Sequence, residues 1–162
     1  MHHRKESNWI EIREITDPEE KSRICGRILH ALPLWFGIEQ SIVEYVEEVR
    51  ALPFYTAWED GRPAGFLAVK PQTEAAAEVC VMGILEEYHR CGFGRALIAR
   101  AEEFCRATGR SFLTVKTLDS SAKYEPYART RAFYRSMGFA PLEVFPTYWD
   151  VQNPCLLMAK RL

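Results

Sequence analysis

The chain has 162 residues, 48% of them hydrophobic and 27% charged, proportions that fit one compact globular domain over residues 1–162 with an adequate core. Its formal net charge is −1 and its basic residues are scattered, so we expect no nucleic acid partner. Since no apolar run approaches the roughly 18 residues of a membrane span and the start MHHRKESNW lacks the apolar part of a signal peptide, we expect a cytoplasmic protein with no membrane partner.

The first half of the chain predicts a strand, two helices and a hairpin. Residues 9–15 alternate apolar and polar side chains, which is typical of a half-buried strand. Residues 16–19 offer a capping box and an early proline, and the apolar residues that follow recur at helical spacing until Pro33. A second helix is expected from about Ser41. Residues 54–58 and 63–69 then form two strands joined through Asp-Gly, a strong hairpin signal.

The second half predicts strands and helices in alternation. Strands are expected at residues 78–84, 111–117, 139–144 and 156–160. One helix begins near Phe93 and stops at Gly109, and another covers residues 129–137 and is closed by Gly138. This order of elements predicts an α/β (α+β) fold, in which a mixed sheet carries helices on its faces.

The turn at residues 89–95, H-R-C-G-F-G-R, joins a predicted strand to a predicted helix. Gly92 and Gly94 carry no Cβ, so the backbone there can adopt positive φ and approach a ligand closely. The first N–H groups of the helix lack intrahelical partners, and the helix dipole adds partial positive charge. Arg90 and Arg95 add fixed charge beside the glycines. We therefore expect this turn to bind the phosphates of a cofactor, although two glycines alone are a weak motif and also suit an ordinary turn.

The familiar nucleotide-binding loops do not occur here, because G-x-x-x-x-G-K-[ST] is missing and no third glycine completes G-x-G-x-x-G. Residues 89–94 instead resemble the acetyl-CoA signature of the GNAT superfamily of N-acetyltransferases, Gln/Arg-x-x-Gly-x-Gly/Ala, with His89 as the first residue. Residues 132–139, A-F-Y-R-S-M-G-F, resemble the family's helix with a tyrosine four residues before Gly-Phe. Many members carry Asn seven residues before that tyrosine, where this sequence has Tyr127 after an extended loop.

The resemblance implies a mixed, mostly antiparallel sheet of about seven strands flanked by about four helices. It also implies acetyl-CoA as the acyl donor, with coenzyme A as a product. The family's main-chain contacts would place the Met82 N–H on the acetyl carbonyl, with residues 83–84 along the pantetheine. The expected cofactor-binding residues are therefore Met82, Gly83, Ile84, His89, Arg90, Cys91, Gly92, Phe93, Gly94 and Arg95.

Acetylation of an amine needs two proton-handling groups, because an ammonium cannot attack and a thiolate leaves better as a thiol. Glu78 stands in an otherwise apolar strand, where loss of hydration would make its carboxylate a stronger base. By position it resembles the general base of some family members, whereas an exposed place at the strand end is the alternative. Tyr134 matches the family's proposed general acid, and without the resemblance it would be read as an aromatic core residue.

Two aromatic, turn-prone segments, residues 32–37 and 145–150, are expected to form walls of an acceptor pocket. Burial against the sheet or a homodimer contact would explain the same rings. Glu39 and Asp150 are candidate sources of negative charge for a cationic amine. The expected acceptor is a primary amine of a small molecule or peptide, and the candidate substrate-binding residues are Trp35, Phe36, Tyr148, Trp149 and Asp150.

Two alternatives stay open at this point. A domain of the same fold could bind acyl-CoA as a sensor or interaction module without catalysis, and the acyl group could be longer than acetyl. The five cysteines form no C-x-x-C pair and the four histidines lack ligand spacing, so we expect reduced thiols and no metal site.

Overall fold

The computed structural model describes residues 10–162, which form seven strands and four α-helices. Trp9, in the first expected strand, lies outside the described residues. The strands are β1 (Glu11–Glu14), β2 (Phe54–Glu59), β3 (Arg62–Pro71), β4 (Ala76–Ile84), β5 (Phe112–Leu118), β6 (Ala140–Asp150) and β7 (Asn153–Arg161). The helices are α1 (Pro18–His30), α2 (Glu39–Glu48), α3 (Phe93–Ala107) and α4 (Glu125–Ser136). Their order along the chain is the one that the sequence predicts.

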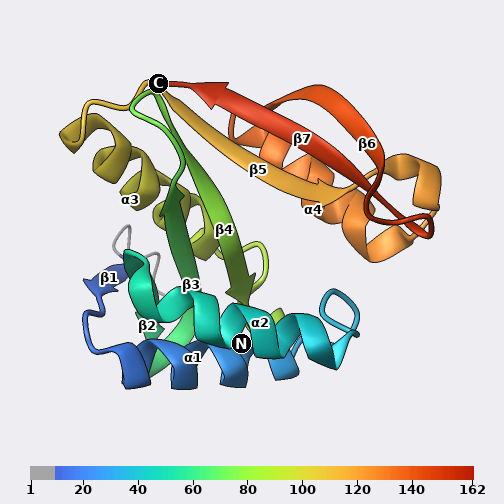
Figure 1. Cartoon of the computed structure of the whole chain (residues 1–162). Helices are drawn as coiled ribbons and strands as arrows, with labels where there is room; N and C mark the ends of the chain where they lie inside the picture. Colours follow the sequence, from blue (N-terminus) through green and yellow to red (C-terminus); the bar gives the residue numbers. More distant parts are fainter. Residues whose placement is uncertain (1–9) are drawn as a thin grey trace.

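The strands form one sheet in the order β1-β2-β3-β4-β5-β7-β6 (Figure 1). Neighbouring strands are antiparallel except for β4 and β5, which run parallel and are connected through α3. The expected mixed, mostly antiparallel sheet of about seven strands with about four helices is therefore confirmed. In the described part of the chain, no helix is both long enough and apolar enough to cross a membrane.

Local signals account for several element boundaries. The Asp17 carboxylate accepts a hydrogen bond from the backbone N–H of Glu20 at 3.1 Å, and Pro18 occupies the first turn of α1. Between β2 and β3, Asp60 and Gly61 have φ values of 52° and 75°. Positive φ at both central residues is what a type I′ hairpin turn requires, so the Asp-Gly prediction is confirmed.

Two hydrophobic cores cover the two faces of the sheet. On one face, α3 packs Leu97, Ile98 and Ala101 against β2 to β5, and α4 adds Tyr134 and Met137. On the other face, α1 and α2 pack against β2, β3 and β4, with the buried residues Ile24, Cys25, Ile28, Leu29, Leu32, Ile42, Phe54, Phe66, Ala68 and Val81. The sheet is thus a middle layer between two pairs of helices.

Helix α4 begins four residues earlier than the sequence pattern predicts. Its first residue is Glu125, and Pro126 lies in its first turn, where a missing N–H costs no helical hydrogen bond. Tyr127 is therefore a helical residue. The connecting segment before α4, residues 119–124, contains a single 3-10 turn at Ser120–Ala122.

The segment at residues 145–150 is also not a loop. It is the second half of β6, which runs to Asp150 and is an edge strand of the sheet. Phe145 is half-buried and every other residue of β6 is exposed. An edge strand tolerates Pro146, because one side of the strand has no neighbour to which an N–H must donate. Exposed rings and a proline made this strand look like a loop.

The sheet divides at β4 and β5. Their pairing stops at Val79 and Val115, and the residue after Val79, Cys80, is an extra residue in a β-bulge opposite the step from Ala68 to Val69. A bulge bends its strand and increases its twist. Figure 1 shows the result, in which β3 and β4 run away from β5 and β7 from a common end, leaving a wedge between β4 and β5.

Candidate active site

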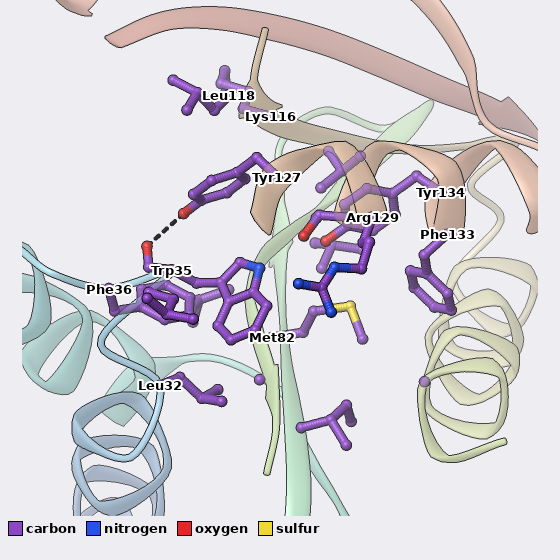
Figure 2. A pocket seen from close by; sticks show the side chains of 18 of the residues that line it. Leu32, Trp35, Phe36, Met82, Lys116, Leu118, Tyr127, Arg129, Phe133 and Tyr134 are labelled. Atoms are coloured by element: carbon purple, nitrogen blue, oxygen red, sulfur yellow. Dashed lines mark hydrogen bonds between the residues drawn. The ribbon is translucent and has the colours of Figure 1, made fainter. Parts of the chain in front are cut away.

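A cavity of about 1410 Å³ occupies this wedge. Residues from the second half of β4 and from β5 form its base, the turn before α3 forms one end, and α4 and the segment between α1 and α2 form its walls. Figure 2 shows Leu32, Trp35 and Phe36 on one side, Met82 from β4 below, and Tyr127, Phe133 and Tyr134 from α4 opposite. The cavity exceeds the usual range of about 300–1,000 Å³ for small-molecule sites, so it suits a large ligand.

The turn before α3 has the backbone expected of an anion site. Arg90 has a φ of 60° and Gly92 a φ of 88°. Non-glycine residues at positive φ have a strained backbone, and such residues cluster at functional sites. The first hydrogen bond of α3 runs from the Ala96 N–H to the Gly92 carbonyl. The N–H groups of residues 93–95 therefore come before the helical hydrogen bonds begin, and these residues line the end of the cavity.

Gly94 is required for a packing reason as well. A Cβ at this position would lie 2.8 Å from Cζ of Phe133, which extends from α4. The missing side chain therefore lets α4 come close to the N-terminus of α3, so both helices border the same end of the cavity. Phe93, Gly94 and Arg95 all line the cavity.

The first residue of the turn is held by the strand before it. His89 Nε2 lies 2.6 Å from the Ile84 carbonyl oxygen, which accepts the bond, and the His89 ring meets Trp35 edge-on at 5.4 Å. His89 also lines the cavity. Through its bond to Ile84, this histidine, which stands where the signature has Gln or Arg, fastens the turn to β4. Cys91 is not among the lining residues. Its thiol donates to the His89 carbonyl at 3.4 Å.

Met82, Gly83 and Ile84 lie on the part of β4 that has left β5. They pair with Leu67, Phe66 and Gly65 of β3 on one side, and the described residues provide no strand on the other. Their backbone therefore borders the cavity, and peptide groups in such an edge can bond an extended ligand as a new strand would. A Cβ on Gly83 would crowd α1, so a bare backbone lets that helix pack closely.

Tyr134 projects from α4 into the wall of the cavity (Figure 2). It is 5% exposed, and its ring packs against Phe133 and Phe139. Burial raises the pKa of its phenol above the ordinary tyrosine value, and the neighbouring phenols of Tyr127 and Tyr45 add to this shift. Among residues 10–162 its hydroxyl has no hydrogen-bond partner, so a phenol O–H is available to a ligand.

Three hydrogen bonds tie the segment between α1 and α2 to the start of α4, across the cavity. Tyr127 Oη donates to the Trp35 carbonyl at 2.6 Å, which is the dashed line in Figure 2, and Tyr124 Oη donates to the Leu34 carbonyl at 2.7 Å. In return Trp35 Nε1 donates to the Pro126 carbonyl at 3.1 Å. We call these bonds the clasp. Burial raises the pKa of Tyr127 to about 12, so its phenol stays a donor at neutral pH.

Glu78 lies in a second, smaller cavity of about 310 Å³. Its carboxylate does not stand in the apolar setting that the strand pattern suggests, because Lys116 Nζ from β5 donates to Glu78 Oε2 at 2.5 Å. Gln72 also donates to the same oxygen at 3.3 Å. The Lys116 side chain loses hydration, which lowers its pKa, but the bond and charge of Glu78 outweigh this and leave the pKa raised.

The candidate acceptor residues differ in which cavity they line. Trp35 and Phe36 line the larger cavity, and Tyr148 and Trp149 line both cavities. Asp150 borders the larger cavity, but its carboxylate accepts hydrogen bonds from Gln152 and Asn153 and thus shapes the turn after β6. Glu39 is not a lining residue, since it is exposed and bonded to His30 at 3.0 Å.

Several residues at the site escape the sequence analysis. Lys116 carries a usable signal, because it is the one charged residue within the apolar strand β5, just as Glu78 is in β4. Arg129 extends from α4 into the cavity in Figure 2, but a single arginine in a polar helix carries no such signal. Tyr45 lines both cavities and resembles a core residue in the sequence, since its neighbours on the helical face are apolar.

The comparisons with known proteins agree with this architecture. An N-acetyltransferase of unknown role from Chlorobaculum tepidum is 27% identical over 127 residues, which span 77% of this chain and 72% of that protein. The crystal structure of an acetyltransferase of the GNAT family from Desulfovibrio desulfuricans has a TM-score of 0.79 at 22% identity, covering 94% of this chain and 99% of that one.

Two further solved structures hold the ligand of this family. An aminoglycoside 6′-N-acetyltransferase complexed with coenzyme A has a TM-score of 0.74 at 18% identity and covers 93% of this chain and 96% of its own. A GNAT family acetyltransferase from Elizabethkingia anophelis with acetyl-CoA bound has a TM-score of 0.68 at 16% identity, with coverages of 94% and 98%. The model of the acetyltransferase (GNAT) family matches residues 9–139, which is most of the sequence, and the chain therefore belongs to that family.

Proposed function

We propose that this protein transfers the acetyl group of acetyl-CoA to a primary amine of a small molecule by direct attack of the amine. The observation that carries the proposal is the shared position of three features around one cavity. Within residues 10–162, these are the N–H groups at the start of α3 that precede the helical ladder, the edge of β4 that has left β5, and the phenol of Tyr134, which has no hydrogen-bond partner there. Each suits a different part of an acyl-CoA molecule.

The residues of the turn before α3 fit the diphosphate. Arg90 and Gly92, both at positive φ, line the end of the cavity, and the dipole of α3 favours an anion there. With a net charge of −1, the chain offers no general attraction for anions, so binding has to come from this local geometry. Bound here, acetyl-CoA supplies an activated thioester beside the free edge of β4.

The proton-handling roles follow from position. The amine must lose a proton as its nitrogen bonds to the carbonyl carbon, and the thiolate released must gain one. Tyr134 lies on the cavity wall as a protonated donor for the sulfur. Glu78, bordering the smaller cavity, is the proposed acceptor of the amine's proton, directly or through water, with Lys116 holding its carboxylate in place.

The aromatic walls support a small acceptor with an apolar portion. Tyr148 and Trp149 border both cavities and are exposed, at 58% and 43%. Aromatic side chains in such a position bind apolar groups and cations alike. Replacement of Trp149 by Ala should therefore raise KM for the acceptor while leaving KM for acetyl-CoA unchanged.

The test of the proposed function mixes the protein with acetyl-CoA and a panel of primary amines, and follows free thiol with a chromogenic reagent. Release of coenzyme A that depends on the amine is the expected result. Thermal stabilisation by acetyl-CoA without amine-dependent release would instead indicate a sensor, and would overturn the proposal.

A matched pair of variants checks the place of binding. Gly92→Glu puts a carboxylate at the phosphate turn at a φ of 88°, whereas Gly109→Glu makes the same change at a φ of 75°, at the far end of α3 with open space around it. Both should lose similar stability, but only Gly92→Glu should lose affinity for coenzyme A in calorimetry. Equal affinities in the two variants would contradict the proposed phosphate site.

A further inference from the structure

The larger and the smaller cavity share part of their lining. Seven residues border both, and they come from α2, from β4 and β5 and from the end of β6: Ser41, Glu44, Tyr45, Cys80, Lys116, Tyr148 and Trp149. The proposed base, Glu78, borders only the smaller cavity, and the proposed acid, Tyr134, borders only the larger. The shared residues therefore lie where an amine entering from the smaller cavity would meet an acyl group in the larger one.

Among the shared residues, Tyr45 combines a fixed ring with an available hydroxyl. Its ring meets Phe36 edge-on at 6.2 Å and packs against the core beneath α1 and α2. In the described part of the chain the hydroxyl has no hydrogen-bond partner. A half-buried hydroxyl that the protein leaves unpaired is available to a polar group of a ligand.

The surroundings of this hydroxyl place it between the two sites. Burial is the main cause that raises its pKa above the ordinary value, and Cys80, Tyr127, Glu48 and Glu78 contribute further. Tyr45 in turn contributes to the raised pKa of Tyr134. Tyr45 itself lines both the cavity that Tyr134 borders and the cavity that Glu78 borders, so it lies where the two cavities meet. It remains a neutral phenol through the physiological range of pH.

We propose that Tyr45 binds the acceptor amine, its hydroxyl oxygen accepting a hydrogen bond from the attacking nitrogen and directing the nitrogen lone pair toward the thioester. This inference rests on the proposed function. The acceptor is then a small primary amine whose body fits the cavity of about 310 Å³, between the rings of Tyr45, Tyr148 and Trp149. Its far end meets the ion pair of Glu48 with Lys70, whose Oε1 and Nζ atoms lie 2.8 Å apart.

The transfer balances with Tyr45 unchanged. The nitrogen of the neutral amine forms a bond to the carbonyl carbon, and the carbon–sulfur bond breaks with its electron pair going to sulfur. The proton lost by nitrogen goes to Glu78 and then to solvent, while sulfur takes the proton of Tyr134, which is regained from solvent. Tyr45 keeps its own proton throughout, because it acts as a hydrogen-bond acceptor toward the amine.

The test compares the wild-type protein with Tyr45→Phe, which removes one oxygen and keeps the ring against Phe36. The matched control is Tyr55→Phe, the same deletion at a core tyrosine of β2 that borders neither cavity. Each protein is assayed with the best acceptor among 2-phenylethylamine, tyramine, n-butylamine and putrescine. The readouts are KM for the amine, KM for acetyl-CoA, kcat and Tm.

The expected result is a rise of about three- to tenfold in KM for the amine with Tyr45→Phe, the usual effect of losing one neutral hydrogen bond. KM for acetyl-CoA and Tm should stay as in the wild type, and Tyr55→Phe should leave both KM values unchanged. An unchanged amine KM and kcat in Tyr45→Phe would overturn the role of Tyr45. A parallel rise in both KM values with a lower Tm would also overturn it, since a packing role behaves in that way. If the wild-type protein acetylates none of the four amines, the proposed function itself fails.

Discussion

Burial keeps the phenol of Tyr134 protonated. A phenol surrounded by Phe133 and Phe139 loses hydration, and since the charged form depends on hydration most, burial raises the pKa of Tyr134. The group therefore holds its proton at every pH at which the protein would work. It can share that proton with the sulfur as the carbon–sulfur bond breaks and negative charge develops there. The same hydroxyl makes no bond within residues 10–162, so the fold gains nothing from it.

Replacement of Tyr134 by Phe should therefore separate catalysis from stability. We expect kcat to fall by about 10²-fold or more, the usual effect of removing a general acid, while Tm stays as in the wild type because the hydroxyl makes no hydrogen bond within residues 10–162. The pH profile of the wild-type kcat should show no decline from Tyr134 below the ordinary tyrosine pKa of about 10. An alkaline decline near neutrality that vanishes in Tyr134→Phe would contradict this assignment.

The contribution of Lys116 to the free energy of unfolding should depend on pH. The pKa of Lys116 is raised in the folded protein, so the lysine stabilises the fold below its unfolded pKa of about 10.4, and this contribution is lost as pH rises through the folded value. Lys116→Met also leaves Glu78 without its partner. Urea unfolding should show the variant less stable than wild type at neutral pH, with the difference shrinking above about pH 10. Lys123→Met, at an exposed lysine directly after the 3-10 turn, is the control, and a difference that is constant with pH would refute the prediction.

At the level of elements, sequence patterns predict order better than extent. The order of eleven strands and helices follows from apolar periodicity, and the Asp-Gly turn fixes one hairpin. The start of α4 and the end of β6 are not predicted, because Pro126 and Pro146 resemble residues that interrupt a helix or a strand. In the structure Pro126 lies in the first turn of a helix and Pro146 on an edge strand, two places where a missing N–H costs nothing.

The same limit applies to the site. The proposed phosphate turn is local, so the glycines and arginines of seven residues between a predicted strand and a predicted helix are enough to suggest it. The pair formed by Glu78 and Lys116 depends on the register of β4 against β5, and the clasp joins residues about 90 positions apart in the chain. No local pattern contains such contacts. Tyr127 stands out in the sequence as a departure from the family motif, but its partner, the Trp35 carbonyl, is visible only in the folded chain.

The clasp gives an element-scale prediction. Tyr127→Phe leaves the Trp35 carbonyl without its donor, and Tyr124→Phe does the same to the Leu34 carbonyl. Each change should lower the free energy of unfolding by about 1 kcal/mol, and amide hydrogen exchange of the segment between α1 and α2 should become faster. Exchange in the β2–β3 hairpin is the internal control and should not change. If exchange between α1 and α2 stays as slow as in the wild type, the three bonds do not hold this segment.

On the scale of the whole molecule, the sheet consists of two arms. One arm, β1 to β4, carries α1, α2 and α3, and the other, β5 to β7, carries α4 (Figure 1). The arms are joined by four residue pairs between β4 and β5, by the core shared between α3 and α4 and, on the open side of the wedge, by the clasp. A ligand in the cavity contacts α3 and β4 from one arm and α4 and β5 from the other, and therefore acts as a further link between them.

Coenzyme A should consequently protect both arms at once. At a free concentration of 100 times Kd it should add about 2.7 kcal/mol to the free energy of unfolding. Exchange should slow at the first turn of α3, along residues 80–84 of β4 and in α4, all of which border the cavity, and stay unchanged in the β2–β3 turn, which does not. In Gly92→Glu the slowing should disappear from both arms together, because the diphosphate is the proposed anchor of the ligand. Protection confined to α3 in the wild type would mean that the ligand rests on one arm alone, and the wedge would then not be its site.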